Sequence, residues 1–373
     1  MRTFRCDHCG NALFFENVSC LQCGSALAFL PDRMDLCSIE PAGDGQDGWF
    51  RRKAGSHTSE GATGSRWRLC DNHTRAQACN FAIPAHDSNP LCVSCRLTRI
   101  LPDLSVPDNQ QRWYRIEVAK RRLFFTLARL GLVLAAPPNG QLQGPVFEFK
   151  ADTPDEQVLT GHADRVITLN VSEADDEERV RRRVALHEPY RTILGHLRHE
   201  SGHYYWDVII DQAGRHDDFR RVFGDEREDY AQALSQHYER GGLRPGWETT
   251  HVSAYATSHP WEDWAETWAH YLHMVDLLET AATFGARMVV PGMETERQFT
   301  DPFSAAGLGF DDLVTQWAPL TVMVNSLNRS LGQEDAYPFA LSRPAIDKLR
   351  FVHDAVRAHA SAHRTEPAPP PQG

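Results

Sequence analysis

The sequence predicts an α+β protein, mostly helical with a small sheet, in which the helical part follows two small cysteine-rich modules. All nine cysteines lie within the first 95 residues, whereas helical periodicity dominates the remainder of the chain. A chain of 373 residues exceeds one typical domain, and its 41% hydrophobic content can fill one large core with small appendages. We therefore expect five segments, bounded at residues 1–30, 31–66, 67–100, 101–362 and 363–373.

The first segment, residues 1–30, contains two Cys-x-x-Cys pairs, each followed by glycine. The four cysteines are Cys6, Cys9, Cys20 and Cys23. Paired cysteines in tight, glycine-bearing turns are typical of a zinc ribbon, in which four thiolates hold one structural Zn²⁺. We therefore predict a four-cysteine zinc site here.

The third segment, residues 67–100, contains four further cysteines at less regular spacing: Cys70, Cys79, Cys92 and Cys95. We predict a second structural zinc site in this segment, and disulfides are the alternative for all eight cysteines. No apolar leader precedes Cys6, which favours a reducing, cytoplasmic compartment and hence thiolate–zinc sites. Cys37 belongs to neither set, and we expect it to be a buried small apolar residue.

Two segments are predicted to lack regular structure. Residues 31–66 are polar and rich in glycine, which indicates a loop or linker, although Trp49 and Phe50 argue against a wholly free segment. The proline-rich tail, residues 363–373, is predicted to be disordered.

Periodic patterns predict the elements of the largest segment, residues 101–362. Apolar residues at helical spacing indicate helices, and apolar–polar alternation indicates strands. We expect helices at residues 109–132, 189–210, 219–240, 260–278, 310–331 and 347–359, strands at 145–149 and 166–171, and a solvated charged connection at 173–183.

The run His199-Glu200-Ser201-Gly202-His203 is the most informative motif of the chain. On a helix, residues four apart project from nearly the same face, so His199 and His203 can bind one Zn²⁺ together. Glu200 then lies beside the metal, where it can accept a proton from a zinc-bound water. The surrounding helical pattern argues against a chance match to this motif.

A catalytic zinc needs a third protein ligand and an open position for water. The helix predicted at 260–278 offers Glu262, Glu266 and His270 on one face, because these residues are four apart. A solvated acidic face is the alternative, although a row of ionisable groups flanked by tryptophans would be costly to bury without a metal. Spacing alone leaves open which acid binds the metal.

Residues 255–266, together with the motif helix, resemble the zinc site of anthrax lethal factor-type peptidases, which is a gluzincin arrangement. The matching residues are Tyr255, Glu262, Ala265 and Glu266. The resemblance implies that Glu262 is the third zinc ligand, that Glu266 supports one of the zinc histidines, and that Tyr255 stabilises the oxyanion.

Over nearly its whole length the chain also resembles the bacterial zinc-binding metallopeptidases that carry an N-terminal zinc ribbon. This resemblance implies a zincin-like domain that cleaves a peptide or protein substrate, with Glu200 as general base, one catalytic zinc and two structural zincs. In zincins a strand such as residues 166–171 commonly forms the rim of the cleft, where an extended peptide can pair with it.

Two other functions remain open at this stage. One is an adaptor whose ribbons bind a partner protein, with His270 closing a structural zinc site, but a structural zinc needs no general base such as Glu200. The other is a nucleic-acid-associated zinc protein, which the net charge of −11 disfavours. No apolar stretch approaches the ~20 residues that span a membrane, so we expect no membrane partner.

Overall fold

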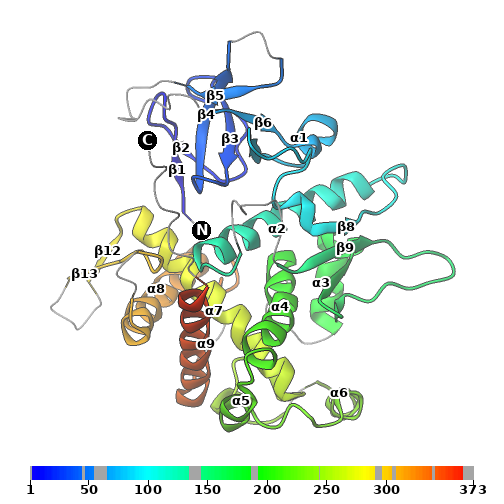
Figure 1. Ribbon diagram of the computed structural model, residues 1–373. Coiled ribbons are helices and arrows are strands. Elements are labelled where there is room, and N and C mark those ends of the chain that lie inside the picture. Colours follow the sequence, from blue (N-terminus) through cyan, green and yellow to red (C-terminus); the bar gives the residue numbers. More distant parts are fainter. Residues whose placement is uncertain are drawn as a thin grey trace.

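The computed structural model describes residues 2–43, 47–53, 65–133, 144–185, 192–242, 244–289, 296–304, 308–337 and 341–363. A strand-rich N-terminal part lies above a larger, mostly helical part (Figure 1). The mixed helix and sheet content predicted from the sequence is confirmed. The predicted tail, beyond residue 363, lies outside the described residues.

The N-terminal part is built on an antiparallel five-stranded sheet in the order β3-β4-β5-β6-β7, with a separate β1-β2 pair and one short helix. These elements are β1 (Phe4–Arg5), β2 (Ala12–Leu13), β3 (Ala26–Leu30), β4 (Asp35–Pro41), β5 (Phe50–Arg52), β6 (Trp67–Leu69), α1 (Asp71–Ala76) and β7 (Ala82–Pro84). The sheet therefore runs through both cysteine-rich modules and joins them.

The segment 31–66, predicted to be a loop or linker, differs from that prediction because it contributes β4 and β5. Leu36 and Ile39 of β4 are buried, and β4 pairs with both β3 and β5. Burial of these apolar side chains outweighs the glycine-rich composition of the neighbouring residues. Cys37, on the same strand, is fully buried, as expected.

An aromatic cluster joins the N-terminal part to the helical part. Helix α2 (Asn109–Arg129) contributes Phe125, whose ring meets three phenylalanine rings edge-on at centroid distances of 6.2, 5.5 and 5.9 Å: Phe4, Phe15 and Phe29. All four rings are buried. Because buried aromatic rings remove large apolar areas from water, the two parts share one core.

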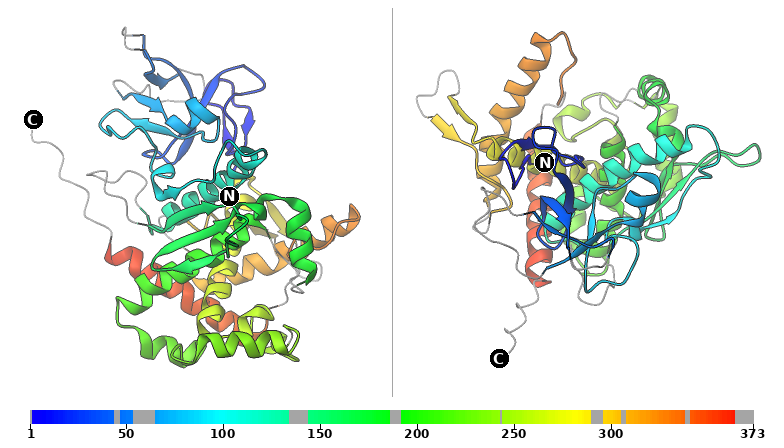
Figure 2. Two further views of the ribbon diagram at one scale, coloured as in Figure 1. Left: turned by 90° about the vertical axis from the view of Figure 1, so that its right-hand side faces the viewer. Right: turned by 90° about the horizontal axis from the view of Figure 1, so that it is seen from above.

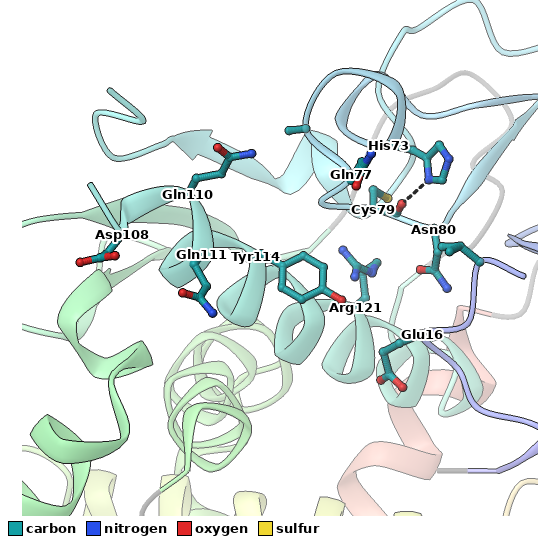
Figure 3. Close-up of a pocket in the computed structure, with 12 residues that line it drawn as sticks. Glu16, His73, Gln77, Cys79, Asn80, Asp108, Gln110, Gln111, Tyr114 and Arg121 are labelled. Atoms are coloured by element: carbon teal, nitrogen blue, oxygen red, sulfur yellow. Dashed lines mark hydrogen bonds between the residues drawn. The ribbon is translucent and has the colours of Figure 1, made fainter. Parts of the chain in front are cut away.

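The same junction holds a cavity of about 780 Å³ between α1, the chain after it, and α2 (Figure 3). Tyr114 and Arg121 of α2 face it, together with Gln77 and Asn80 from the N-terminal part. Arg121 is buried and donates a hydrogen bond to the carbonyl oxygen of Ala78 at 2.5 Å. The arginine thus ties α2 to the chain between α1 and β7.

The helical part begins with a four-stranded sheet in the order β10-β11-β9-β8. Its strands are β8 (Thr98–Ile100), β9 (Val146–Lys150), β10 (Gly161–Ala163) and β11 (Val166–Asn170). The strands expected at 145–149 and 166–171 correspond to β9 and β11. However, β11 pairs in parallel with β9 and antiparallel with β10, so β11 is an inner strand and the edge strands are β10 and β8.

Helices α4 (Ile193–Trp206) and α7 (Pro260–Thr283) cross in the middle of the helical part (Figure 1). A Cβ on Gly202 of α4 would lie 2.9 Å from the Cα of Ala265 in α7, so glycine is required for this close approach. Helix α4 begins after Thr192, whose hydroxyl caps it, while the first residues of the helix predicted at 189–210 lie outside the described residues. A π-helical turn, Asp207–Asp211, continues α4.

The remaining elements surround this pair: α3 (Asp176–Ala185), α5 (His216–Phe223), α6 (Tyr230–Glu239), β12 (Arg287–Val289), β13 (Glu296–Gln298), α8 (Phe310–Ser330) and α9 (Arg343–Ala362). Seen from above, α8 projects away from the body of the molecule (Figure 2). The helices expected at 310–331 and 347–359 correspond to α8 and α9.

Two predictions for the helical part were wrong in detail. The single helix predicted at 219–240 is two helices, α5 and α6, because Gly224 adopts φ 102° after α5 and Asp229 caps α6. The connection predicted to be solvated at 173–183 contains α3 and the fully buried Glu173. Charge density alone did not reveal that this carboxylate points inward.

Buried histidine makes the stability of this part depend on pH. Burial lowers the pKa of His353, on α9, to about 4, and its Nδ1 lies 3.2 Å from the hydroxyl of Tyr271. The depressed pKa means that the folded state disfavours the proton, so stability is full above the ordinary pKa near 6.5 and falls as pH decreases towards 4. We expect His353 to contribute about 1 kcal/mol of stability at pH 7 that is lost by pH 5.

Urea unfolding of wild type and His353→Gln at pH 7 and pH 5 measures this contribution. Glutamine can still accept from Tyr271 but does not titrate, so the variant should show the smaller loss of unfolding free energy between the two pH values. Acid effects on metal ligands are common to both proteins and cancel in the comparison. An identical pH dependence in the two proteins contradicts the prediction.

Candidate metal centre

Three side chains converge where α4 crosses α7. The Nε2 atoms of His199 and His203 lie 3.2 Å apart, and Oε2 of Glu262 lies 3.0 Å from the first and 3.5 Å from the second. Zinc binds nitrogen and oxygen at about 2.0–2.1 Å, so tetrahedral ligand atoms are separated by about 3.3 Å. The three donor atoms therefore already have the spacing that one zinc ion requires.

The two helices supply these ligands by different local devices. Helix α4 places His199 and His203 one turn apart, and α7 places Glu262 in its first turn, where the helix dipole favours a carboxylate. Indole nitrogens of α7 fix the alignment, since Trp264 donates to the carbonyl oxygen of Gly202 at 2.8 Å and Trp268 to the hydroxyl of Ser201 at 3.1 Å. These two tryptophans, which lie on the same helix as Glu262 and Glu266, therefore hydrogen-bond α7 to α4.

Glu266 lies against the outer nitrogen of one histidine. Its Oε1 is 2.7 Å from Nδ1 of His199, and its Oε2 accepts a hydrogen bond from the hydroxyl of Ser253 at 2.6 Å. A proton on Nδ1 leaves the lone pair of Nε2 available to bind a metal. Of the two histidines, His199 is therefore the one that Glu266 contacts.

His270 does not join this cluster, although it shares the spacing of Glu262 and Glu266. Its Nδ1 lies 2.5 Å from the hydroxyl of Tyr337, deep among the C-terminal helices. The ligand cluster formed by the described residues contains His199, His203 and Glu262. The structure thus brings two of the three residues on this face of α7 to the centre.

The two glutamates nearest the histidines differ in their electrostatics. Burial raises the pKa of Glu200, although His199 and His203 oppose the shift. Burial also acts on Glu262, but His203 and His199 outweigh it and hold the pKa of that carboxyl well below its usual range. One carboxylate is thus suited to remain a charged ligand and the other to exchange a proton.

Two aromatic residues and a histidine complete the surroundings. Tyr255, in a 3₁₀ turn at Tyr255–Thr257, is the predicted tyrosine, and its ring centroid lies 5.9 Å from that of His199. Sequence reasoning missed Tyr230, whose hydroxyl donates to Oε1 of Glu262 at 2.7 Å. It also missed His162 of β10, whose ring lies 6.1 Å from that of His203. No spacing rule links these two residues to the motif.

The eight predicted zinc-ribbon cysteines form two clusters with zinc-type spacing. Sulfur atoms lie 3.7 Å apart in Cys6 and Cys23 and 3.6 Å apart in Cys9 and Cys20. In the second cluster, made of Cys70, Cys79, Cys92 and Cys95, the sulfurs of Cys79 and Cys92 are 3.7 Å apart. Zinc–sulfur bonds of about 2.3 Å give tetrahedral sulfur separations of about 3.8 Å. A disulfide requires about 2.05 Å, so these distances favour zinc over disulfides.

Arg121 balances the charge of the second cluster. Burial lowers the pKa of this guanidinium, but Cys79, Glu117 and Cys95 outweigh the effect and raise it. A permanent positive charge beside four thiolates offsets the negative charge that a zinc site of four cysteines carries. The second cluster is therefore electrostatically linked to α2 and hence to the helical part.

These three clusters predict the metal content. We expect three Zn²⁺ per chain, two bound by cysteines and one by His199, His203 and Glu262. Elemental analysis of protein purified without chelator should approach this ratio, and all cysteines should titrate as thiols after denaturation with a chelator. A ratio near one, with the cysteines oxidised, contradicts the assignment of the cysteine clusters.

Comparisons with known proteins place the chain in a family. A family model described as "Putative zinc-binding metallo-peptidase" matches residues 109–355, and a zinc-ribbon domain model matches residues 3–106. Uncharacterized proteins of Mycobacterium bovis and of two strains of Mycobacterium tuberculosis are 40% identical over 360 residues, which is 95% of this chain and of each relative. No solved structure matches.

The helices that the structure describes include none with both the length and the apolar composition needed to cross a membrane.

The two matched regions meet between residues 106 and 109. The first is the cysteine-rich module, and the second is the helical part with a zinc-type ligand cluster. The chain therefore belongs to the zinc-binding metallopeptidase family of that description, with a zinc-ribbon domain at its N-terminus.

Proposed function

We propose that the protein is a zinc-dependent peptidase of the gluzincin type, with a zincin-like catalytic domain at residues 101–362. The observation that carries the proposal is the triangle of donor atoms from His199, His203 and Glu262, with the buried Glu200 on the same helix as the histidines. A cluster of three protein ligands leaves a coordination position for water, as catalytic zinc sites do. The two clusters of four cysteines are then the structural sites.

The surrounding residues suit hydrolysis of a peptide bond. Zinc bound there would polarise the scissile carbonyl and lower the pKa of a water molecule towards ~7. Glu200 accepts the proton of the attacking water and returns it to the leaving amine, a task that its burial-raised pKa favours. Tyr255 donates a hydrogen bond to the oxygen on which negative charge develops.

The alternatives from the sequence have less support. An adaptor with a closed structural site would need His270 as a fourth ligand, but the imidazole of His270 is engaged with Tyr337. It would also leave no role for the buried Glu200 carboxylate. A nucleic-acid-associated protein remains disfavoured by the net charge of −11.

Cleavage of an unfolded protein tests the proposed function. We expect the purified protein to cleave reduced casein, to lose activity in 1,10-phenanthroline, and to regain it on addition of zinc. A peptide hydroxamate should inhibit, because it binds zinc through the position that water occupies, while serine-protease inhibitors should have no effect. Cleavage that persists after removal of zinc, or the absence of cleavage from zinc-loaded protein, argues against a peptidase.

A further inference from the structure

We propose that Tyr230 is a positioning residue that makes Glu262 bind the metal through a single oxygen. The Tyr230 hydroxyl donates to Oε1 of Glu262 at 2.7 Å, while Oε2 of the same carboxylate faces the histidine nitrogens at 3.0 and 3.5 Å. The two oxygens of this ligand thus have separate partners. The inference deepens the proposed function and rests on the same metal cluster.

Because Glu262 is buried, the separate partners of its two carboxylate oxygens matter for metal binding. The residue is 1% exposed, so its carboxylate is screened from solvent and each oxygen depends on protein or metal partners. Oε2 is buried and has no hydrogen-bond donor among the described residues, as expected for the atom that binds a metal. A carboxylate can bind zinc through one or both oxygens, and a hydrogen bond to Oε1 favours the first mode.

The Tyr230 ring is itself held by the start of α7. Its centroid lies 5.3 Å from the ring of His259 and 5.9 Å from that of Trp261, both in edge-on contact. The His259 ring accepts from the backbone amide of Trp261 through Nδ1, so its Nε2 carries the proton and donates to the carbonyl oxygen of Glu228 at 3.1 Å. His259 therefore joins the chain just before α6 to the turn that carries Glu262.

The position of Tyr230 at the N-terminus of α6 also fixes its backbone. Asp229 caps α6 by accepting from the amide of Gln232 at 3.0 Å, which makes Tyr230 the first residue of the helix. Later in α6, His237 is buried with its ring 5.8 Å from that of Tyr255. Helix α6 is thus anchored at the metal centre by two of its side chains, and Tyr230 is the one that reaches a ligand.

A ligand restricted to one oxygen keeps the metal four-coordinate, with the fourth position open to water or substrate. Without the hydroxyl, Oε1 is free to approach the metal as well. Loss of the hydrogen bond should therefore weaken zinc binding and raise the coordination number. Both changes can be measured without substrate.

The test compares Tyr230→Phe with Tyr238→Phe, a matched loss of one phenol hydroxyl on the same helix. The Tyr238 ring lies more than two turns further along α6, where it meets the ring of His237 at 5.5 Å. Competitive zinc titration should show about 10- to 100-fold weaker binding at the histidine site for Tyr230→Phe and wild-type binding for Tyr238→Phe. The cysteine sites serve as an internal control in each protein.

Cobalt substitution provides the second measurement. Four-coordinate Co²⁺ absorbs visible light more strongly than five-coordinate Co²⁺, so Tyr230→Phe should show weaker bands and Tyr238→Phe the wild-type spectrum. A wild-type cobalt spectrum in Tyr230→Phe overturns the proposal whatever the zinc affinity. Equally weak cobalt bands in the two variants also overturn the proposal, because the effect would then come from α6 in general and not from the Tyr230 hydroxyl.

These readouts separate the inference from the proposed function. If wild-type protein fails to cleave casein but Tyr230→Phe alters the cobalt spectrum, the peptidase assignment fails and the positioning role stands. If wild-type protein cleaves casein but Tyr230→Phe leaves the cobalt spectrum unchanged, the positioning role fails and the peptidase assignment stands.

Discussion

We expect the replacement of Glu200 with glutamine to reduce the proposed peptide hydrolysis by orders of magnitude while leaving the zinc content unchanged. Glutamine keeps the shape of the side chain but cannot accept a proton, and Glu200 is not one of the three residues in the ligand cluster. Removal of a general base lowers turnover by about 10²–10⁴-fold. The reduction should appear in kcat for casein or a fluorogenic peptide, with an unchanged melting temperature.

A control variant distinguishes the loss of this base from the loss of negative charge. Glu248 is exposed on a 3₁₀ turn at Trp247–Thr249, and Glu248→Gln should retain full activity and metal. Wild-type turnover in Glu200→Gln means that another group is the base, and the mechanism proposed for this centre is then wrong. Loss of zinc together with activity would instead show that Glu200 contributes to metal binding.

The second large effect is expected from the two glutamates of α7. Glu262→Ala removes a charged ligand whose Oε2 lies 3.0 Å from Nε2 of His199, so zinc at this site should be lost under mild chelation. Glu266→Ala removes the carboxylate on Nδ1 of His199 but no ligand atom, so zinc should remain and bind about 10- to 100-fold more weakly. Competitive titration with a zinc-sensitive dye measures both.

Ser253→Ala refines this comparison. The serine hydroxyl donates to Oε2 of Glu266 at 2.6 Å and so acts on His199 through that carboxylate, which means that its loss should weaken zinc binding less than Glu266→Ala does. The opposite order for the glutamates, with Glu266→Ala emptying the site and Glu262→Ala nearly silent, would move the ligand one turn along α7. Tyr255 would then lose its proposed role, since that role depends on Glu262 as ligand.

Local spacing predicted those parts of the site that lie on one element. His199, Glu200 and His203 fall within two turns of α4, so helical geometry alone determines that the two imidazoles share a face. The cysteine sets are also recognisable, because the first contains two Cys-x-x-Cys pairs and the second contains one such pair after two more widely spaced cysteines. The helix carrying Glu262 was predicted from Pro260 and the absence of later breakers, and α7 extends further, to Thr283.

Contacts between distant segments could not be predicted from local spacing. Tyr230 lies 32 residues before Glu262, and no periodicity connects the two positions. The same holds for His162, which lies on β10, an edge strand of its sheet, with its ring 6.1 Å from that of His203. The strands within 31–66 were missed for a related reason, since their stability comes from pairing with β3 and β6 and not from local composition.

The sequence by itself indicated the family through its resemblance to known peptidases. It also determined the helix with the His199-Glu200-Ser201-Gly202-His203 motif, the two cysteine sets and three candidates for the third ligand, because these depend on residue type and spacing along one segment. Only the tertiary structure decided that Glu266 contacts His199, that His270 contacts Tyr337, and that Tyr230 donates a hydrogen bond to Oε1 of Glu262. These outcomes depend on how closely α4 and α7 approach at Gly202 and where α6 is anchored. The distances between these helices are set by the packing of side chains from different elements, and the pattern of residues along one segment does not reveal them.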